Sequence, residues 1–184
     1  MNNELLELWG KAFAQCWEGL PLTLSLTFVS LLIGSLLALP LSVIHSRRTT
    51  WQAKLVRLFT FFFTGTPLLV QLYIFYDGFG GLGWVQNLMT KEGFGFLRDA
   101  YFWVLLGLTL NTAAYSTIIF SGAINNTEYG EIEAGRAYGL SSFQVMRHII
   151  LPSSLRRALP AYSNEVILML QASALASSFT LFEI

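Results

Sequence analysis

The sequence has few charged residues, a single cysteine and no net charge, and each shortage excludes a class of protein. Only 12% of the 184 residues are charged, with 11 Lys and Arg against 11 Asp and Glu. Balanced charges provide no basic surface, so we expect no nucleic-acid partner. The single cysteine, Cys16, excludes an internal disulfide framework and a cysteine-only metal site.

Residues that would support catalysis are also sparse. The two histidines, His45 and His148, lie far apart, and no carboxylate pair or nucleophile is spaced for metal or acyl chemistry. No glycine-rich phosphate loop of the Walker type is visible. We therefore expect no catalytic residue, no metal site and no enzyme activity.

Hydrophobic residues are abundant instead. They make up 54% of the chain, which is too many for an ordinary soluble domain of this size. About 20 residues of helix cross a hydrocarbon core of about 30 Å. Four runs reach that length, and the charged residue Glu165 lies in the last of them: 22–44, 58–76, 100–124 and 159–182. We predict one all-α integral membrane domain over residues 1–184, because backbone polar groups in lipid must pair within their own helix.

Basic residues gather in two of the three connections between these runs. Four lie between the first and second runs and four between the third and fourth, whereas the rest of the chain holds three. Cytoplasmic connections carry the excess of Lys and Arg. We therefore expect the first and third connections to be cytoplasmic and the N-terminus to lie on the outer side.

The third connection, residues 125–155, is long enough to carry structure of its own. A short helix is predicted over Glu131–Tyr138 and ends at Gly139, because glycine readily adopts the left-handed conformation that closes a helix. Ser141 begins a Ser-x-x-Gln capping box, so a second helix should follow and end before Pro152. Two defined helices favour docking of a cytoplasmic partner, and a plain solvated connector is the alternative.

Several motifs resemble one family of membrane proteins. The "EAG" at 133–135, Gly139 and the "ILP" at 150–152 are similar to the EAA loop of permease subunits of bacterial ABC importers. Three further segments resemble the polar amino-acid branch: "GTPLLVQLYIFYDG" at 65–78, "AAYSTIIFSGAI" at 113–124 and "YSNEVILML" at 162–170. Within this branch, "FTGTPLLVQ" and "SNEVILML" resemble the M-type permeases of arginine uptake.

The resemblance implies the transmembrane fold of type I ABC importers, with a cytoplasmic coupling helix, in the bacterial inner membrane with a periplasmic N-terminus. Members have a fifth membrane helix after the segment that corresponds to "FEI" at 182–184. A truncated sequence and a shortened gene product both remain open as explanations for its absence.

The implied function is ATP-dependent import of a polar or basic L-amino acid, with L-arginine as the first candidate and histidine and glutamine as alternatives. The implied partners are a second homologous permease, a periplasmic amino-acid-binding protein, membrane lipid and an ABC ATPase subunit that binds ATP and Mg, so this chain itself should bind no cofactor. A pore or helper subunit that works without ATP would explain the apolar runs but not the folded loop.

By position in the EAA motif, the resemblance implies that six residues couple the permease to the ATPase: Glu133, Ala134, Gly135, Gly139, Leu151 and Pro152. Gly135 stands where the family has its second alanine. In addition, Thr64, Ile118 and Ser121 stand where many members carry charged residues. Either the second permease supplies much of an amino-acid site, or Glu165 receives the cationic end of the solute.

Polar residues inside the apolar runs indicate a candidate substrate pathway. A charge at mid-membrane costs at least about 2.5 kcal/mol, so Glu165 needs a partner, a proton or a water-filled cavity. Pro67 lacks a backbone donor and frees a carbonyl that protein or a cavity must receive. A packing kink and hydrogen bonds between helices are the alternative roles. The predicted pathway residues are Thr64, Thr66, Pro67, Gln71, Asn111, Tyr115, Asn164 and Glu165.

Overall fold

Helices joined by short connections make up the part of the chain that the structure describes. This computed structural model describes residues 2–47 and 49–181, and for residues 2–7, 11–16, 18 and 175–181 it describes the backbone alone. No strand occurs within these ranges, which confirms the all-α prediction. The elements are α1 (Asn2–His45), α2 (Trp51–Gly65), α3 (Leu68–Tyr73), the π-helical segment η1 (Ile74–Phe79), α4 (Gly83–Met89), the 3-10 turn η2 (Gly95–Arg98), α5 (Ala100–Asn125), α6 (Tyr129–Ala137), α7 (Ser142–Val145), the π-helical segment η3 (Met146–Ile150) and α8 (Leu151–Leu181).

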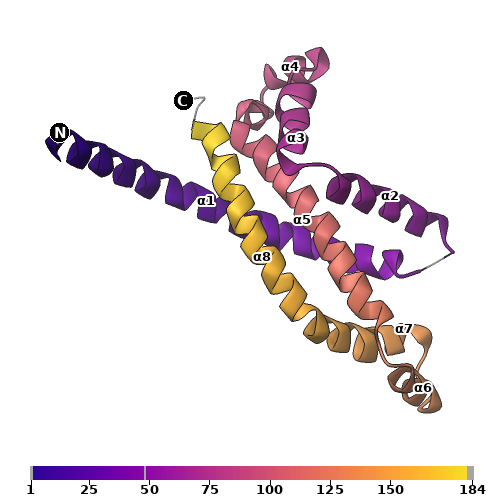
Figure 1. The fold of residues 1–184 in the computed structure, drawn as a ribbon. Coiled ribbons are helices and arrows are strands. Elements are labelled where there is room, and N and C mark those ends of the chain that lie inside the picture. The colour runs from indigo at the N-terminus through magenta and orange to yellow at the C-terminus, as the bar shows by residue number, and fades with distance from the viewer. Residues whose placement is uncertain (1, 48, 182–184) are drawn as a thin grey trace.

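Helix α5 is the centre of the bundle and contacts α1, α2 and α8 (Figure 1). In the most apolar stretch of each helix, 67% of the α5 residues are buried, against 28% for α1. The close approach of α1 and α5 depends on Gly34, because a Cβ there would lie 2.7 Å from the Cβ of Thr112. Small residues at such a contact let two membrane helices pack backbone against backbone.

Within the described residues, two helices are long and apolar enough to cross a membrane, Gly19–His45 of α1 and the whole of α5. A third crossing is possible if α2 is combined with α3 and η1, which together are bent by 108°. The predicted run 58–76 is therefore a broken helix. The predicted run 159–182 falls in α8, apart from its last residue, which lies outside the described residues. Polar residues such as Asn164 and Gln171 lower the hydropathy of α8, and its crossing stays a prediction.

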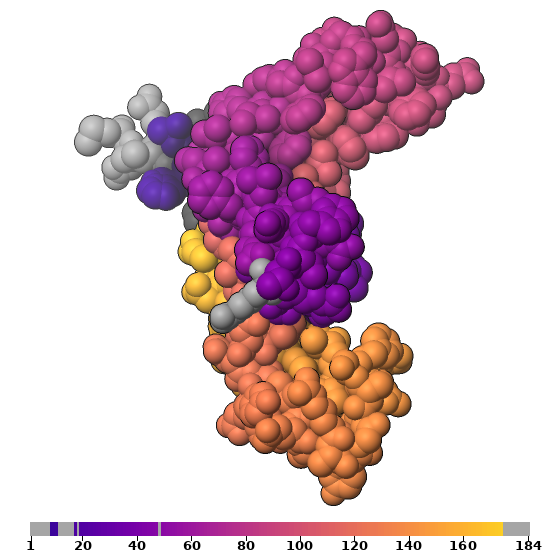
Figure 2. All heavy atoms as spheres, turned by 90° about the vertical axis from the view of Figure 1, so that its right-hand side faces the viewer, coloured from indigo at the N-terminus to yellow at the C-terminus, as the bar shows by residue number. Residues whose placement is uncertain are grey.

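The two basic connections lie at the same end of the molecule. Val43, near the end of α1, packs against a buried cluster of Ile124, Val145 and Ile150 from the end of α5 and the α7–η3 segment. Figure 2 shows α6 and α7 forming a lobe at the lower end, and Figure 1 places α4 at the opposite end. A shared end is what the charge distribution predicts for these two connections, and their side of the membrane stays a prediction.

Candidate functional site

Helices α2 and α3 are separated by two extended residues. Thr66 has φ −113° and ψ 143°, and Pro67 has φ −60° and ψ 135°. A proline disfavours the helical conformation in the residue before it, so the sequence Thr-Pro ends α2. Helix α3 then begins at Leu68 in a new direction, and the carbonyl groups at the end of α2 lose their helical partners.

Gln71 satisfies the carbonyl groups that the break exposes. Its side chain is almost fully buried, and Nε2 donates to the carbonyl oxygens of Phe63 at 2.7 Å and Thr66 at 2.9 Å. Asn111 of α5 donates from Nδ2 to Oε1 of Gln71 at 3.1 Å and to the Phe63 carbonyl at 3.4 Å. Unpaired backbone groups in hydrocarbon cost several kcal/mol, so these two amides stabilise the broken helix.

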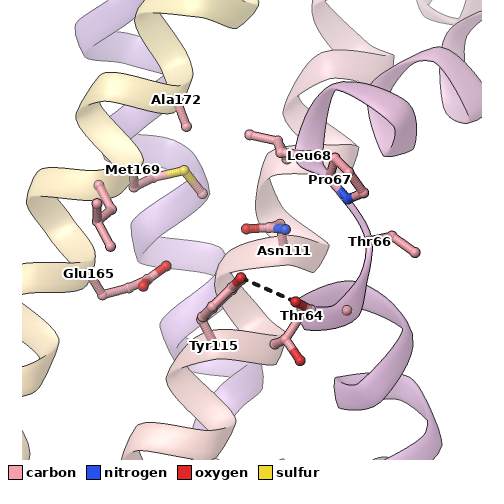
Figure 3. A pocket seen from close by; sticks show the side chains of 11 residues that line it. Thr64, Thr66, Pro67, Leu68, Asn111, Tyr115, Glu165, Met169 and Ala172 are labelled. Carbon is pink, nitrogen blue, oxygen red and sulfur yellow. Dashed lines mark hydrogen bonds between the residues drawn. The ribbon is translucent and has the colours of Figure 1, made fainter.

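A cavity of about 400 Å³ lies between the break, α5 and α8 (Figure 3). Six of the eight predicted pathway residues line it, and Gln71 and Asn164 do not. Gln71 lies behind the cavity wall, where its side chain donates hydrogen bonds to the carbonyls of the break. The full lining is Thr64, Gly65, Thr66, Pro67, Leu68, Asn111, Tyr115, Glu165, Leu168, Met169 and Ala172.

Asn164 is exposed on the outer face of α8, whereas its neighbour Glu165 is buried. Successive residues of an α-helix differ by about 100° in direction, because 3.6 residues make a turn. Glu165, Met169 and Ala172 follow the spacing of one helical face and point at the cavity. Asn164 therefore does not line this cavity, and its place in a substrate pathway stays a prediction.

Glu165 is the charged residue of the cavity, and it has no partner among the residues that the structure describes. The residue is 6% exposed, yet within the described residues its carboxylate forms neither a hydrogen bond nor an ion pair. In Figure 3 it points from α8 toward α5, beside Tyr115 and Asn111. A carboxylate at this depth is stabilised only by a cation, a proton or water that enters the cavity.

The other polar side chains of the cavity face it as hydrogen-bond acceptors, because they donate their hydrogens to other groups of the protein. The hydroxyls of Thr64 and Thr66 donate to carbonyls one helical turn back, and the Tyr115 hydroxyl donates to the Thr64 carbonyl at 3.4 Å. The Asn111 amide donates to the Phe63 carbonyl and to Gln71, and its oxygen faces the cavity in Figure 3. The cavity is therefore rich in acceptors and suits a cation with several N–H groups.

Hydrogen bonds between helices are the alternative role for polar residues in the apolar runs. Asn111 and Tyr115 form such bonds beside the cavity, and others occur elsewhere in the bundle. Thr27 pairs with Ser173, and Ser35 pairs with Tyr162, so two hydroxyl pairs join α1 to α8. Neither pair includes a residue that lines the cavity. The polar groups of α8 thus divide between packing against α1 and facing the cavity.

The segment from α6 to η3, residues 129–150, forms a hairpin, and its predicted turn signals are confirmed. Gly139 has φ +80°. The Ser141 N–H donates to Oε1 of Gln144 at 2.8 Å, and the Gln144 N–H donates back to Oγ of Ser141, which completes the capping box. The first helix is Tyr129–Ala137, which begins two residues earlier and ends one residue earlier than predicted.

The prediction that the second helix ends before Pro152 is wrong. Helix α7 continues through η3 into α8, and Pro152 is the second residue of α8. A proline ring crowds the carbonyl four residues back and offers no N–H. The wider π-helical turn directly before Pro152 accommodates both effects, so the chain bends without leaving the helix.

The six predicted coupling residues differ in burial. Glu133, Ala134, Gly139 and Pro152 are exposed, Leu151 is half-buried and Gly135 is buried. A Cβ on Gly135 would collide with the side chain of Ile149, so the missing side chain lets α6 pack on η3. Beside this contact, Tyr138 is 89% exposed and Phe143 is 70% exposed. The hairpin therefore presents unpacked aromatic rings and one glutamate to its surroundings.

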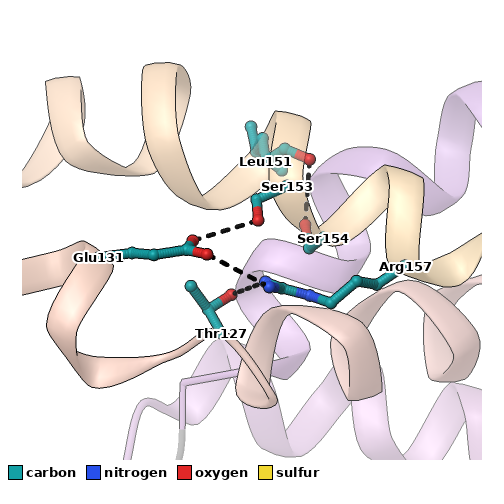
Figure 4. Close-up of polar contacts among 6 residues, drawn as sticks. All are labelled: Thr127, Glu131, Leu151, Ser153, Ser154 and Arg157. Carbon is teal, nitrogen blue, oxygen red and sulfur yellow. Dashed lines mark hydrogen bonds and ion pairs between the residues drawn. The ribbon is translucent and has the colours of Figure 1, made fainter.

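A polar cluster that sequence reasoning missed ties the hairpin to α8 (Figure 4). Nη1 of Arg157 lies 3.6 Å from Oε1 of Glu131, and Nη2 donates to Oγ1 of Thr127 at 2.9 Å. The hydroxyl of Ser153 donates to Oε2 of Glu131 at 3.1 Å. We call these four residues the clamp. Opposite charge was the available signal, but no periodic spacing links Glu131 to Arg157.

A membrane bundle with a broken helix beside a polar cavity is an arrangement typical of solute transporters. Residues 30–183 match the family described as the inner membrane component of binding-protein-dependent transport systems. The chain belongs to this family.

Relatives and solved structures agree with this assignment. The chain is 47% identical to the histidine/lysine/arginine/ornithine transport system permease protein HisM of Escherichia coli. The match extends over 173 residues and covers 94% of this chain and 71% of that protein. It is 42% identical over 179 residues to the octopine transport system permease protein OccM of Rhizobium meliloti, with 97% and 71% covered.

Two solved structures share the fold. A crystal structure of an amino acid ABC transporter with histidines superposes with a TM-score of 0.75 at 30% identity, covering 93% of this chain and 74% of that chain. The MetNI methionine ABC transporter in an inward-facing conformation gives a TM-score of 0.65 at 23% identity, covering 89% and 72%, and shows the fold alone. The predicted ABC importer transmembrane fold is thereby confirmed.

Proposed function

We propose that this chain is the permease subunit of an ATP-dependent importer that carries a polar or basic L-amino acid across the bacterial inner membrane. L-Arginine is the first candidate, and histidine, lysine and ornithine are the nearest alternatives. The family match and the transport systems named for the relatives support the class of solute. The chain contributes the membrane path, and a separate subunit hydrolyses ATP.

The observation that carries the proposal is the unpaired carboxylate of Glu165 on the cavity wall. A basic amino acid brings a cation to this carboxylate and N–H groups to the surrounding oxygen atoms. An arginine side chain offers five N–H donors and no acceptor. That pattern complements a cavity in which Thr64, Thr66 and Tyr115 have already donated their hydrogens.

A second permease subunit is proposed to complete the site. The cavity offers no cation for the carboxylate end of an amino acid, since its charged lining residue is Glu165. Asn164 and Gln171 are exposed on one stripe of α8. Amide side chains at this depth need hydrogen-bonding partners, and a helix of a second, homologous permease would supply them.

The hairpin is proposed as the docking site of the ATPase subunit, on the cytoplasmic side. Its exposed Glu133, Ala134 and Gly139 and the nearby Tyr138 and Phe143 provide a contact surface. The opposite end, with α4 and the N-terminus, would then face the periplasm and receive the amino-acid-binding protein.

The experiment is uptake of labelled L-arginine into vesicles that contain the complete complex, with binding protein outside and ATP inside. Histidine, lysine, ornithine and glutamine serve as competitors. We expect uptake that requires ATP and is inhibited most by the basic amino acids. Equal uptake without ATP would contradict the importer and favour a pore, and inhibition by glutamine alone would contradict the role of Glu165.

A further inference from the structure

We propose that Arg157 is a positioning residue for transport: it fixes α6 of the hairpin to α8, so that a displacement of the hairpin reaches the cavity. The inference rests on the proposed function, and it names a link that lies outside the EAA motif. The observation behind it is the clamp, whose residues come from the α5–α6 connection, from α6 and from the N-terminal end of α8 (Figure 4).

The clamp uses both arms of one guanidinium and both oxygens of one carboxylate. Arg157 contacts Glu131 of α6 through Nη1 and Thr127, in the segment between α5 and α6, through Nη2. The second oxygen of Glu131 accepts from Ser153 of α8. One ion pair and two hydrogen bonds thus join α6 and the segment before it to α8, and the two hydrogen bonds are directional.

The packing contact beside the clamp has a different character. Gly135 of α6 rests on the aliphatic side chain of Ile149 in η3, and this contact involves no hydrogen bond. The contact is close because Gly135 has no side chain, and it is apolar, so it adds packing but no directed bond. The clamp supplies the directional link that such a contact lacks.

Helix α8 carries the clamp and the cavity on one continuous element. Arg157 and Glu165 are eight residues apart, about 12 Å along a helix axis, and the helix is unbroken between them, Pro160 included. Any movement of α6 that preserves the clamp therefore moves the N-terminal end of α8, and Glu165 lies two helical turns further along the same helix.

The clamp contributes little to stability, which makes its role testable. Both charged side chains are 35% exposed, and ion pairs at such exposure add little to the free energy of unfolding. Arg156, the adjacent residue, is also exposed and belongs to no ion pair in the described residues. Arg156→Gln is therefore a matched control for Arg157→Gln.

The experiment compares these variants in vesicles that contain the complete complex, with three readouts: arginine binding without ATP, ATP hydrolysis and arginine uptake per ATP hydrolysed. We expect Arg157→Gln and Glu131→Gln to retain binding and basal hydrolysis and to lose uptake per ATP by about fivefold or more. Exchanging the charges, Glu131→Arg with Arg157→Glu, should restore part of the loss, and Arg157→Lys should retain an intermediate ratio. Arg156→Gln should behave as the unaltered complex.

An unchanged ratio of uptake to ATP hydrolysis in Arg157→Gln overturns the inference. A parallel loss of binding and complex stability also overturns it, because Arg157 would then be structural. Failure of the unaltered complex to take up arginine with ATP contradicts the proposed function itself, so the two failures are distinguishable.

Discussion

Two of the charged residues of helix α8, Arg157 and Glu165, lie in opposite environments. Arg157 is paired with Glu131 and Thr127 at the foot of the helix. Glu165, two turns further on, is more deeply buried and has no partner within the described residues. A satisfied charge holds two elements together, whereas a buried, unsatisfied charge is costly unless something binds it. This contrast is the basis of the two proposals, mechanical linkage at Arg157 and ligand binding at Glu165.

Replacement of Glu165 is expected to have the largest effect, because it removes the unsatisfied charge. Hydrogen bonds to charged groups contribute about 1.5 to 3 kcal/mol, so Glu165→Gln should weaken arginine binding by roughly 10- to 100-fold. Glu165→Asp keeps the charge and should retain part of the affinity. Binding of labelled arginine to the purified complex measures both, and equal affinity in all three proteins would remove the contrast with Arg157.

Gln71→Leu tests whether the cavity depends on the amides behind the break. The variant leaves the Thr66 carbonyl and the Asn111 donor without the side chain that now pairs them. Each unpaired buried group costs about 1 to 3 kcal/mol, so the melting temperature of the purified protein should fall and arginine binding should weaken with it. Gln86→Leu, at an exposed position of α4, is the control and should change neither.

Gly139→Val acts on the hairpin and should spare the cavity. A side chain at φ +80° is strained, by about 1 to 2 kcal/mol for an L-residue. We expect normal membrane insertion and arginine binding but loss of the ATPase stimulation caused by loaded binding protein. Asparagine tolerates this conformation, so Gly139→Asn should retain stimulation. Gly130→Val, where nothing lies within 4 Å, is a second control. Normal transport by Gly139→Val would contradict the docking role of the hairpin.

The smallest effect is expected at the capping box. Ser141→Ala removes the hydroxyl that accepts from the Gln144 N–H, which costs about 1 kcal/mol of local helix stability. Hydrogen exchange of the α7 amides should increase a few-fold, while binding of arginine stays unchanged. Exchange that increases instead around Glu165 would show that the two regions are not separable in this way.

Local signals in the sequence predicted the hairpin well. Glycine at a helix end and the Ser-x-x-Gln pattern act within a few residues, and both Gly139 and Ser141 behave as expected. The continuation of the helix through Pro152 was not predictable in this way. It involves a π-helical turn in which Ile150 is buried with Ile124 and Val145, and Ile149 packs against the same cluster.

Contacts between distant residues decided what the sequence left open. The break at Pro67 was foreseeable, but its partners Gln71 and Asn111 are 40 residues apart and follow no period. The direction of Asn164 and Glu165 was ambiguous because both are polar and adjacent. Glu165, Met169 and Ala172 are spaced to share one face of a helix. Their side chains differ so much in polarity that no hydrophobic or polar pattern in the sequence indicates that face.

The most direct test of the central claim compares two ligands of nearly the same shape, arginine and its uncharged analogue citrulline. Binding of both to the complete complex is measured before and after Glu165→Gln. If the carboxylate pairs with the cationic end of the solute, the unaltered complex prefers arginine by about tenfold or more, and the variant loses that preference. A preference that survives the substitution would contradict the account.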